Sequence, residues 1–383
     1  MKNSFPSYYT FTKEQFSDLW EESLFVPDTN VLLHLYRLSL TTREKLINIF
    51  TKIDDRLWVP HQVGYEFSKN RPTVILTQNR VYEDAKKELQ TLQENITNKF
   101  QTFQADIRDC LDRNENALQG KHSRYPFIYH LDFSEKSEKI ESIFEKLDQK
   151  IESVMKELGE EIDEQEEKRK EEYPTTPNED HILNTLTSLV DGKVGPAYCK
   201  KRLEEIYEEG KTRYKNEVPP GYKDSSDKTG NDIYGDLVLW FQIIDKAKEV
   251  KKPIILVTNN RKEDWWWKAC GRTIGPQPEL RSEMWDKANV LFYMYNLEQF
   301  MEFAQEQGLA EVNQEVIDEI KEVRLQDEVN RLQSRPSLSA ASEQLMKLQP
   351  SAIEQALRDL ESQPSAIARL MRDLESMKRA TTI

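Results

Sequence analysis

Short runs of consecutive apolar residues alternate along the chain with longer segments in which apolar residues recur every three or four positions. The runs have the length and composition of buried strands: LFVP at 24–27, LWVP at 57–60, PIILVT at 253–258 and ANVLFYMY at 288–295. The segment HQVGYEFSKNR, which follows the second run, has the spacing of a helix. Strands separated by helices are typical of α/β domains. The pattern therefore predicts an α/β fold with a central, mostly parallel sheet flanked by helices.

The middle of the chain shows a different pattern. Apolar residues recur at steps of three and four over 81–111 and again over 140–162, so each stretch marks one face of a long amphipathic helix. The connecting residues, 120–133, include Pro126 and several aromatic residues. Two long helices joined by a short connector predict an antiparallel helical hairpin.

The C-terminal segment is polar, has helical spacing and contains a repeat. QPSAIEQALRDLES at 349–362 is followed by QPSAIARLMRDLES at 363–376, and ten of the fourteen positions are identical. Each unit is a helix of three turns or fewer, which is marginal alone in water. Because two near-copies present the same Ile/Leu face, we favour a docking module that folds on a partner over a frayed tail.

These patterns divide the chain into four parts. The α/β domain is predicted to comprise 1–80 and 216–305, with a helical insertion at 81–215 between its two halves. The helical tail with the 14-residue repeat is predicted to span 306–383.

Charge and cysteine content limit the classes of function. The net charge of −14 argues against a protein that coats nucleic acid non-specifically. Basic residues nevertheless lie near the polar motifs described below, and we expect these to contact a nucleic-acid backbone: Lys69, Arg71, Lys223, Lys228, Arg261 and Lys262. No apolar run approaches the roughly 20 residues of a membrane span. Three widely separated cysteines show no disulfide or zinc pattern, so we expect a reducing, cytoplasmic setting.

Acidic residues stand where an active site of an open α/β sheet would form, beyond the carboxyl ends of the strands. Asp28 directly follows the run at 24–27, with Asn30 two residues on to steady it. Glu66 lies on the helical segment after the second run. Asp236 opens the apolar segment LVLWFQII, and Asp232 precedes it by four residues.

The strand at 253–258 is followed by further polar residues. Asn259 and Asn260 stand directly after it, and Asp264 comes before the helix-like segment DWWWKA. Each of these acidic residues, considered alone, also has an ordinary structural explanation. Asp28 and Asp264 suit helix caps, Asp236 suits a first helical turn and Glu66 suits a solvated helix face. Taken together in this order, they fit a site in which carboxylates hold Mg²⁺ or Mn²⁺, since hard cations prefer oxygen ligands.

The ordered set of motifs resembles the bacterial PIN-like domain family. It comprises FVPDTNVLLHLYR, LWVPHQVGYEFSKNR, LVDGKVGPAY, EEIYEEG, PPGYKD followed by GNDIYGDLVLW, VTNNRKEDWW, GPQPEL and FYMYNLEQF, within residues 10–305. The tail from 306 lies outside the resemblance.

The resemblance implies a PIN-like fold and a metal-dependent nuclease that hydrolyses phosphodiester bonds of RNA or DNA. It implies that Asp28, Glu66 and Asp236 are the first, second and third acids, and that the setting is a bacterial defence or toxin-type system. One departure stands out: members usually have Thr-Asp-Asp at the strand end, and this chain has Thr258, Asn259 and Asn260. Asp264 or Asp232 is then the candidate for a fourth carboxylate.

A second hypothesis is a non-catalytic or partner-activated PIN-like protein. The asparagine pair, the acidic net charge and the repeated tail favour it, with the tail binding another protein such as an ATPase or an antitoxin-like regulator. The amphipathic helices also allow a homodimer. A nucleotide-binding sheet has little support, because no glycine-rich phosphate loop follows a strand.

Overall fold

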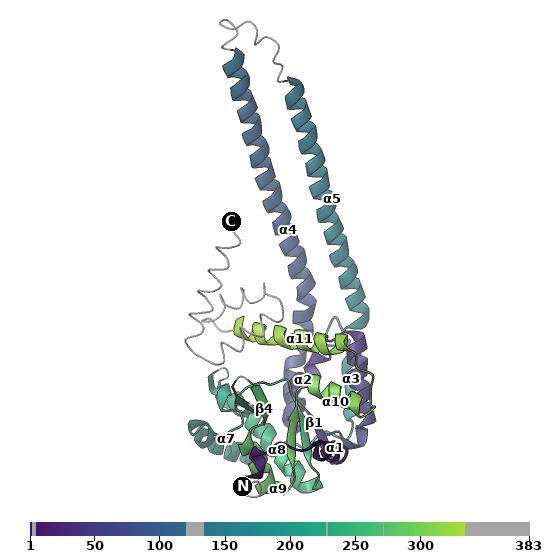
Figure 1. The fold of residues 1–383 in the computed structure, drawn as a ribbon, viewed down its shortest axis with the longest axis vertical. Helices are drawn as coiled ribbons and strands as arrows, with labels where there is room; N and C mark the ends of the chain where they lie inside the picture. Colours follow the sequence, from purple (N-terminus) through teal and green to yellow (C-terminus); the bar gives the residue numbers. More distant parts are fainter. Residues whose placement is uncertain (2–4, 120–133, 227–228, 271, 334–383) are drawn as a thin grey trace. The chain divides into compact units, whose positions relative to one another are not determined.

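A computed structural model describes the chain except for residues 2–4, 120–133, 227–228, 271 and 334–383. The chain forms two compact units (Figure 1). One contains Met1–Val74 together with the chain from His181 onward, and the other contains Ile75–Asp180. The connector at 120–133 and the repeat at 349–376 lie outside the described residues.

The first unit is built on a parallel sheet in the order β1-β2-β5. Its strands are β1 (Leu24–Pro27), β2 (Ile254–Val257) and β5 (Phe292–Tyr295). All residues of β1 and β2 are buried, as expected for parallel strands covered on both faces. The run at 57–60 is shorter than a strand and forms two single bridges, Phe25 with Leu57 and Val59 with Val194. The predicted α/β fold with a parallel central sheet is confirmed.

Helices make up most of the remaining structure. Their bounds are α1 (Lys13–Glu22), α2 (Thr29–His34), α3 (Leu40–Lys52), α4 (His61–Gln119), α5 (Ser134–Glu172), α6 (His181–Val190), α7 (Lys200–Lys215), α8 (Gly235–Val250), α9 (Pro278–Ala288), α10 (Leu297–Glu306) and α11 (Gln314–Gln333). Within the described residues, short 3₁₀ turns lie at Pro6–Tyr8, Asp54–Arg56, Tyr222–Ser226 and Gly230–Tyr234. Among the described helices, none combines the length and the apolar character that a bilayer crossing requires.

Aromatic side chains fill the core around the sheet. Trp20 packs against Phe25 of β1 and against Phe300 of α10. Trp240 of α8 packs against Phe292 of β5. Helix α8 is buried on almost all sides, which explains why its sequence is apolar without a clear stripe. The core therefore holds the carboxyl ends of β1 and β2 on a rigid scaffold.

The tryptophan run forms a strand and not a helix. Trp266–Ala269 is β3, and it pairs antiparallel with β4 (Arg272–Pro276). The helix-like interpretation of DWWWKA was therefore wrong, because three consecutive bulky residues have no period that separates a helix from a strand. Trp265 and Trp266 are buried in the core.

The second unit is an antiparallel helical hairpin made of α5 and the part of α4 from Ile75 onward (Figure 1). Phe100 and Phe103 of α4 contact Phe144 of α5 through their rings. Ion pairs fix the register, with Lys86 2.6 Å from Asp163 and Arg108 2.6 Å from Glu141.

Candidate active site

Asp28 stands where β1 ends and α2 begins. Its Oδ1 accepts a hydrogen bond from the backbone N–H of Thr29 at 2.7 Å, so it caps α2. Its Oδ2 accepts from Asn30 Nδ2 and from Thr258 Oγ1, each at 2.6 Å. Three donors therefore hold both oxygens of this carboxylate in one orientation.

Asn30 and Thr258 join the ends of β1 and β2. Asn30 Nδ2 lies 3.2 Å from Thr258 Oγ1, and Asn30 Oδ1 accepts from the backbone N–H of Asn259 at 2.8 Å. Thr258 is fully buried. Because β1 and β2 are parallel neighbours, their carboxyl ends meet at one sheet edge, as the sequence argument requires.

Glu66 reaches this edge from the first turns of α4. Its Oε2 accepts from Thr29 Oγ1 at 3.2 Å, and its Oε1 accepts from Gln62 Nε2 at 2.8 Å. Gly235, at the start of α8, is closely approached: a Cβ added there would lie 2.7 Å from Glu66 Oε1. Glycine is needed at 235 so that α4 and α8 can bring Glu66 and the neighbouring Asp236 to the same place.

Asp236 lies in the first turn of α8. Its Oδ2 accepts a hydrogen bond from the indole Nε1 of Trp265 at 2.9 Å. Gly221 covers it from the loop at 219–226, where a Cβ would lie 2.9 Å from Asp236 Cβ. Gly221 also has φ +90, a conformation that glycine adopts without strain.

Asp264 is fully buried beside Asp236. Its Oδ2 accepts from the backbone N–H groups of Gly221 and Lys223, at 2.9 and 3.2 Å. Its Oδ1 is buried with no hydrogen-bond partner among the described residues. Asp264 therefore does not cap a helix, and one of its oxygens is available to a ligand.

The acids act on one another electrostatically. Burial, followed by the negative charges of Asp236 and Glu66, raises the pKa of Asp28 to about 6, although the Thr258 hydrogen bond opposes the rise. Burial and the charge of Asp236 likewise raise the pKa of Asp264. Carboxylates that are crowded and at least half-buried, as these are, are stabilised by a cation.

The donor set fits a divalent cation. All four groups are carboxylates, which Mg²⁺ and Mn²⁺ prefer, and Asp264 Oδ1 is an orphaned buried oxygen. Within the described part of the chain, no group of three or more His, Cys, Asp or Glu side chains is already arranged as metal ligands. Asp28, Glu66 and Asp236 each accept hydrogen bonds from protein donors in this conformation.

The remaining predicted acid lies apart from this group. Asp232 is exposed and forms an ion pair with Lys69 at 2.8 Å. Lys69 lies one turn beyond Glu66 on α4, so the pair flanks the candidate site without entering it.

Most of the predicted nucleic-acid-binding residues are paired with acids. Lys223 pairs with Glu263, and Lys262 pairs with the buried Asp224. Arg261 lies 3.2 Å from Glu298. Arg71 is partly exposed on α4, and Lys228 lies outside the described residues.

The asparagine pair at the end of β2 has structural contacts. Asn259 Oδ1 accepts from the backbone N–H of Leu297 at 3.0 Å, and its Nδ2 lies 2.8 Å from His34 Nδ1. Asn260 Oδ1 accepts from the backbone N–H of Lys262 at 3.0 Å. Both side chains therefore accept hydrogen bonds from backbone groups near the strand end.

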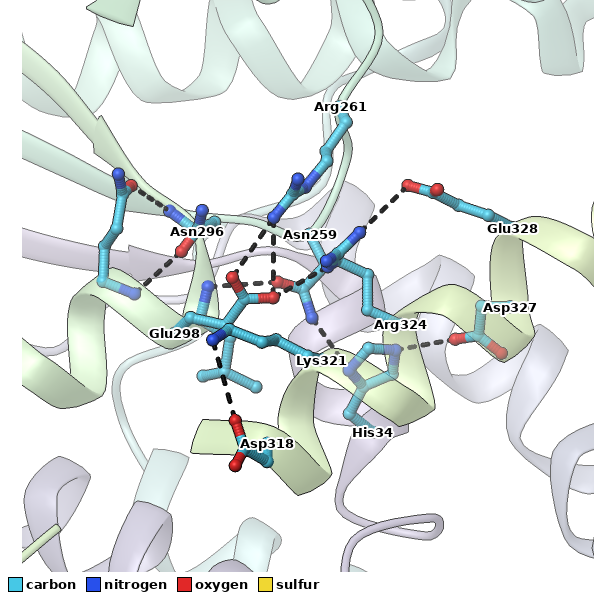
Figure 2. A network of polar contacts seen from close by, with 12 residues as sticks. His34, Asn259, Arg261, Asn296, Glu298, Asp318, Lys321, Arg324, Asp327 and Glu328 are labelled. Atoms are coloured by element: carbon cyan, nitrogen blue, oxygen red, sulfur yellow. Dashed lines mark hydrogen bonds and ion pairs between the residues drawn. The ribbon is translucent and has the colours of Figure 1, made fainter. Parts of the chain in front are cut away.

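Figure 2 shows that this strand end is linked to α11. His34 Nε2 lies 2.7 Å from Asp327 Oδ2, so the ring bridges Asn259 and α11. Burial lowers the pKa of His34 to about 3, with the charge of Arg37 adding to the effect. The neutral ring therefore accepts from Asn259 at Nδ1 and donates to Asp327 at Nε2.

Several residues of the site were missed by the sequence argument. Thr258, Gln62 and Trp265 each donate to one of the acids, and Gly221 packs against Asp236. Asn30 and His34 are four residues apart, so they lie on the same face of α2. This spacing could have indicated that α2 presents a polar face to the strand end.

Trp265→Phe is expected to reduce any metal-dependent activity by about 10-fold and to raise the metal concentration required. The reason is that a donor orienting a ligating carboxylate is worth about 10- to 100-fold. Activity as a function of metal concentration is the measurement. Trp285→Phe, an exposed tryptophan on α9, is the matched control. Equal metal dependence in both variants would contradict the role assigned to Trp265.

The family model described as PIN like domain matches residues 24–280, about two-thirds of the chain. The chain therefore belongs to the PIN-like domain family. No curated protein and no solved structure matches it. The matched range contains Asp28, Glu66, Asp236 and Asp264, and it ends within α9.

Proposed function

We propose that the protein is a metal-dependent nuclease that hydrolyses phosphodiester bonds of RNA or DNA. The supporting observation is the group of four carboxylates at one sheet edge, in which Asp264 keeps an orphaned buried oxygen and burial, followed by like charges, raises the pKa of Asp28. PIN-like domains are generally nucleases, so the fold supports the same assignment.

Each acid has a role in this proposal. Asp28, Glu66 and Asp236 would hold Mg²⁺ or Mn²⁺, and Asp264 would supply a further ligand from the loop after β2. A bound divalent cation would stabilise charge on the phosphate oxygens and lower the pKa of an attacking water. Thr258, Asn30 and Trp265 would keep the carboxylates oriented through the hydrogen bonds described above.

The backbone of the substrate would be held by basic residues at the rim. Lys69, Lys223, Lys262 and Arg261 each have an acidic partner, so a phosphate must replace that partner. Exposed ion pairs such as Lys69–Asp232 contribute little to stability, so the exchange meets little resistance there.

A partner-activated or non-catalytic PIN-like protein is the second candidate. The structural contacts of Asn259 and the neutralised basic residues favour it. In this case the C-terminal tail would bind a protein partner, such as an ATPase. We also propose that the protein acts in the cytoplasm, in a bacterial defence or toxin-type system.

The decisive experiment is a cleavage assay on single- and double-stranded RNA and DNA with Mg²⁺, Mn²⁺ or a chelator. Glu66→Gln serves as the inactive comparison, because it keeps the side chain's shape and removes its charge. Metal-dependent cutting by the wild type alone would support the nuclease and name its substrate. Absence of cutting under every condition, with metal binding shown by calorimetry, would favour the partner-activated candidate.

Metal binding is expected to weaken as the pH falls below about 6. The raised pKa of Asp28, about 6, means that protons compete with the cation for its carboxylate below this value. Titration of Mg²⁺ or Mn²⁺ at pH values on either side of 6 measures the effect. An affinity independent of pH across this range would argue against Asp28 as a ligand.

A further inference from the structure

The helical hairpin leaves a set of apolar side chains in solvent. Leu76 of α4 is also exposed, but the helical count places it about 140° away from Val81. Seven others are between 38% and 54% exposed: Val81, Leu92 and Phe103 on α4, and Ile143, Leu147, Val154 and Leu158 on α5. We call this set the apolar face. Among the described residues of the hairpin unit, buried apolar side chains are few: Ile75, Phe144, Met155 and Tyr173. The hairpin thus exposes more large apolar residues than it buries.

The exposed residues form one stripe on each helix. Val81, Leu92 and Phe103 follow one another at intervals of eleven residues, which is close to three helical turns. Their directions around the helix axis therefore differ by only about 20° from one residue to the next. The four residues on α5 fall within about 60° of one another by the same count. Scattered exposed apolar residues are normal, but aligned ones indicate a face that packs against something.

The two stripes lie on the same side of the hairpin. Phe100 of α4 and Phe144 of α5 mark the inward directions, because their rings pack together. Each stripe is rotated from its inward direction by roughly 40–100° in the same sense along its own helix. Because the helices run antiparallel, an equal sense of rotation leads both stripes to one side.

The register makes this face self-complementary. The ion pairs Lys86–Asp163 and Arg108–Glu141 place Leu92 level with Val154 and Leu158. They also place Phe103 level with Ile143 and Leu147. A two-fold axis can lie in the plane of the face, perpendicular to the helix axes and midway between the Leu92 group and the Phe103 group. Such an axis would place the Leu92 group of one copy on the Phe103 group of the other.

We propose that the apolar face binds the same face of a second copy of this chain, with the two hairpins antiparallel in a four-helix bundle. The face is about 33 Å long, from the rise of α4 between residues 81 and 103, and about 20 Å wide. That is roughly 700 Å² per copy, near the 800 Å² of a standard interface. The acidic segment at 157–172, with nine acids and three bases, disfavours the parallel pairing, which would place like charges side by side.

The test is the mass of the full-length chain in solution, measured by sedimentation from about 0.1 to about 100 µM, a range in which any dimer of micromolar or tighter affinity is detected. The variant Leu92→Glu/Leu147→Glu places charges on the apolar face. Asn98→Glu/Gln149→Glu places the same charges on exposed positions that the helical count puts on the opposite side. We expect a dimer for the wild type and the control, and a monomer for the first variant. A monomeric wild type, or a dimer in both variants, overturns the proposal.

Cross-linking gives a second measurement that does not depend on the charged variants. The three native cysteines are first replaced by serine, and Leu92→Cys and Phe103→Cys are made separately. Antiparallel pairing predicts efficient cross-linking when the two single variants are mixed, and weak cross-linking for Leu92→Cys alone. Preferential cross-linking of Leu92→Cys to itself, or none in the mixture, overturns the antiparallel dimer. Neither measurement depends on the proposed nuclease activity.

Discussion

Asp28→Asn is expected to abolish metal-dependent cleavage, with a loss of at least about 10³-fold. Charge stabilisation by a bound cation contributes several kcal/mol to such reactions, and several kcal/mol corresponds to that factor in rate. Asparagine keeps the shape of the side chain and can still accept from the backbone N–H of Thr29. It removes the negative charge that the cation requires.

The same substitution is not expected to destabilise the fold. The pKa of Asp28 in the folded protein is about 6, above the usual value of an aspartate. A raised carboxyl pKa means that stability is lost as the pH rises through this interval, because the folded state disfavours the ionised form. At neutral pH the uncharged asparagine therefore removes an unfavourable charge, and the melting temperature should stay equal or rise.

Cleavage rates and thermal unfolding, both with and without Mg²⁺, test these two expectations together. Asp55→Asn, at an exposed aspartate of the 3₁₀ turn Asp54–Arg56, is the control. Addition of Mg²⁺ should raise the melting temperature of the wild type and of the control, but not that of Asp28→Asn. Undiminished cleavage by Asp28→Asn would refute the assigned site.

Glu298→Ala is expected to lower the free energy of unfolding by about 3–5 kcal/mol, because breaking a buried ion pair leaves an uncompensated charge. Glu298 Oε1 lies 2.7 Å from Arg324 Nε, and both residues are buried. Arg261 approaches the same carboxylate at 3.2 Å (Figure 2). Without Glu298, the remaining ion-pair partner of Arg324 among the described residues is Glu328, at 3.6 Å.

Denaturant unfolding of three proteins measures this effect. Glu302→Ala removes an exposed glutamate from the same helix and should change stability by less than about 0.5 kcal/mol. The double variant Glu298→Ala/Arg324→Met removes both charges and should recover part of the loss. If the single and double variants were equally unstable, lost packing and not the unpaired charge would be the cause.

Much of the fold followed from local patterns. The three strands of the sheet and the helical hairpin have clear periods or apolar runs, and Asp28 and Asp236 stand at the ends of such elements. The β3-β4 hairpin did not follow, because Trp265 to Trp267 are equally compatible with a helix or a strand.

The features that were missed depend on contacts between distant parts of the chain. His34 and Asp327 are 293 positions apart, and no local period relates them. The ion pairs of Lys223 and Lys262 were likewise invisible, since a sequence shows a charge without its partner. The burial of Asp264 arises from the loop at Gly221, which is 43 positions away.

The position of α11 limits where the chain can be shortened. The family match ends at residue 280, yet Glu298 and its partner Arg324 lie beyond that point and are buried together. A fragment that stopped after α10 would remove Asp327 from His34 and would leave Glu298 with Arg261 but without Arg324. An expression fragment of the PIN-like domain should therefore extend through Gln333, the last residue of α11, even though the family pattern alone suggests an earlier end.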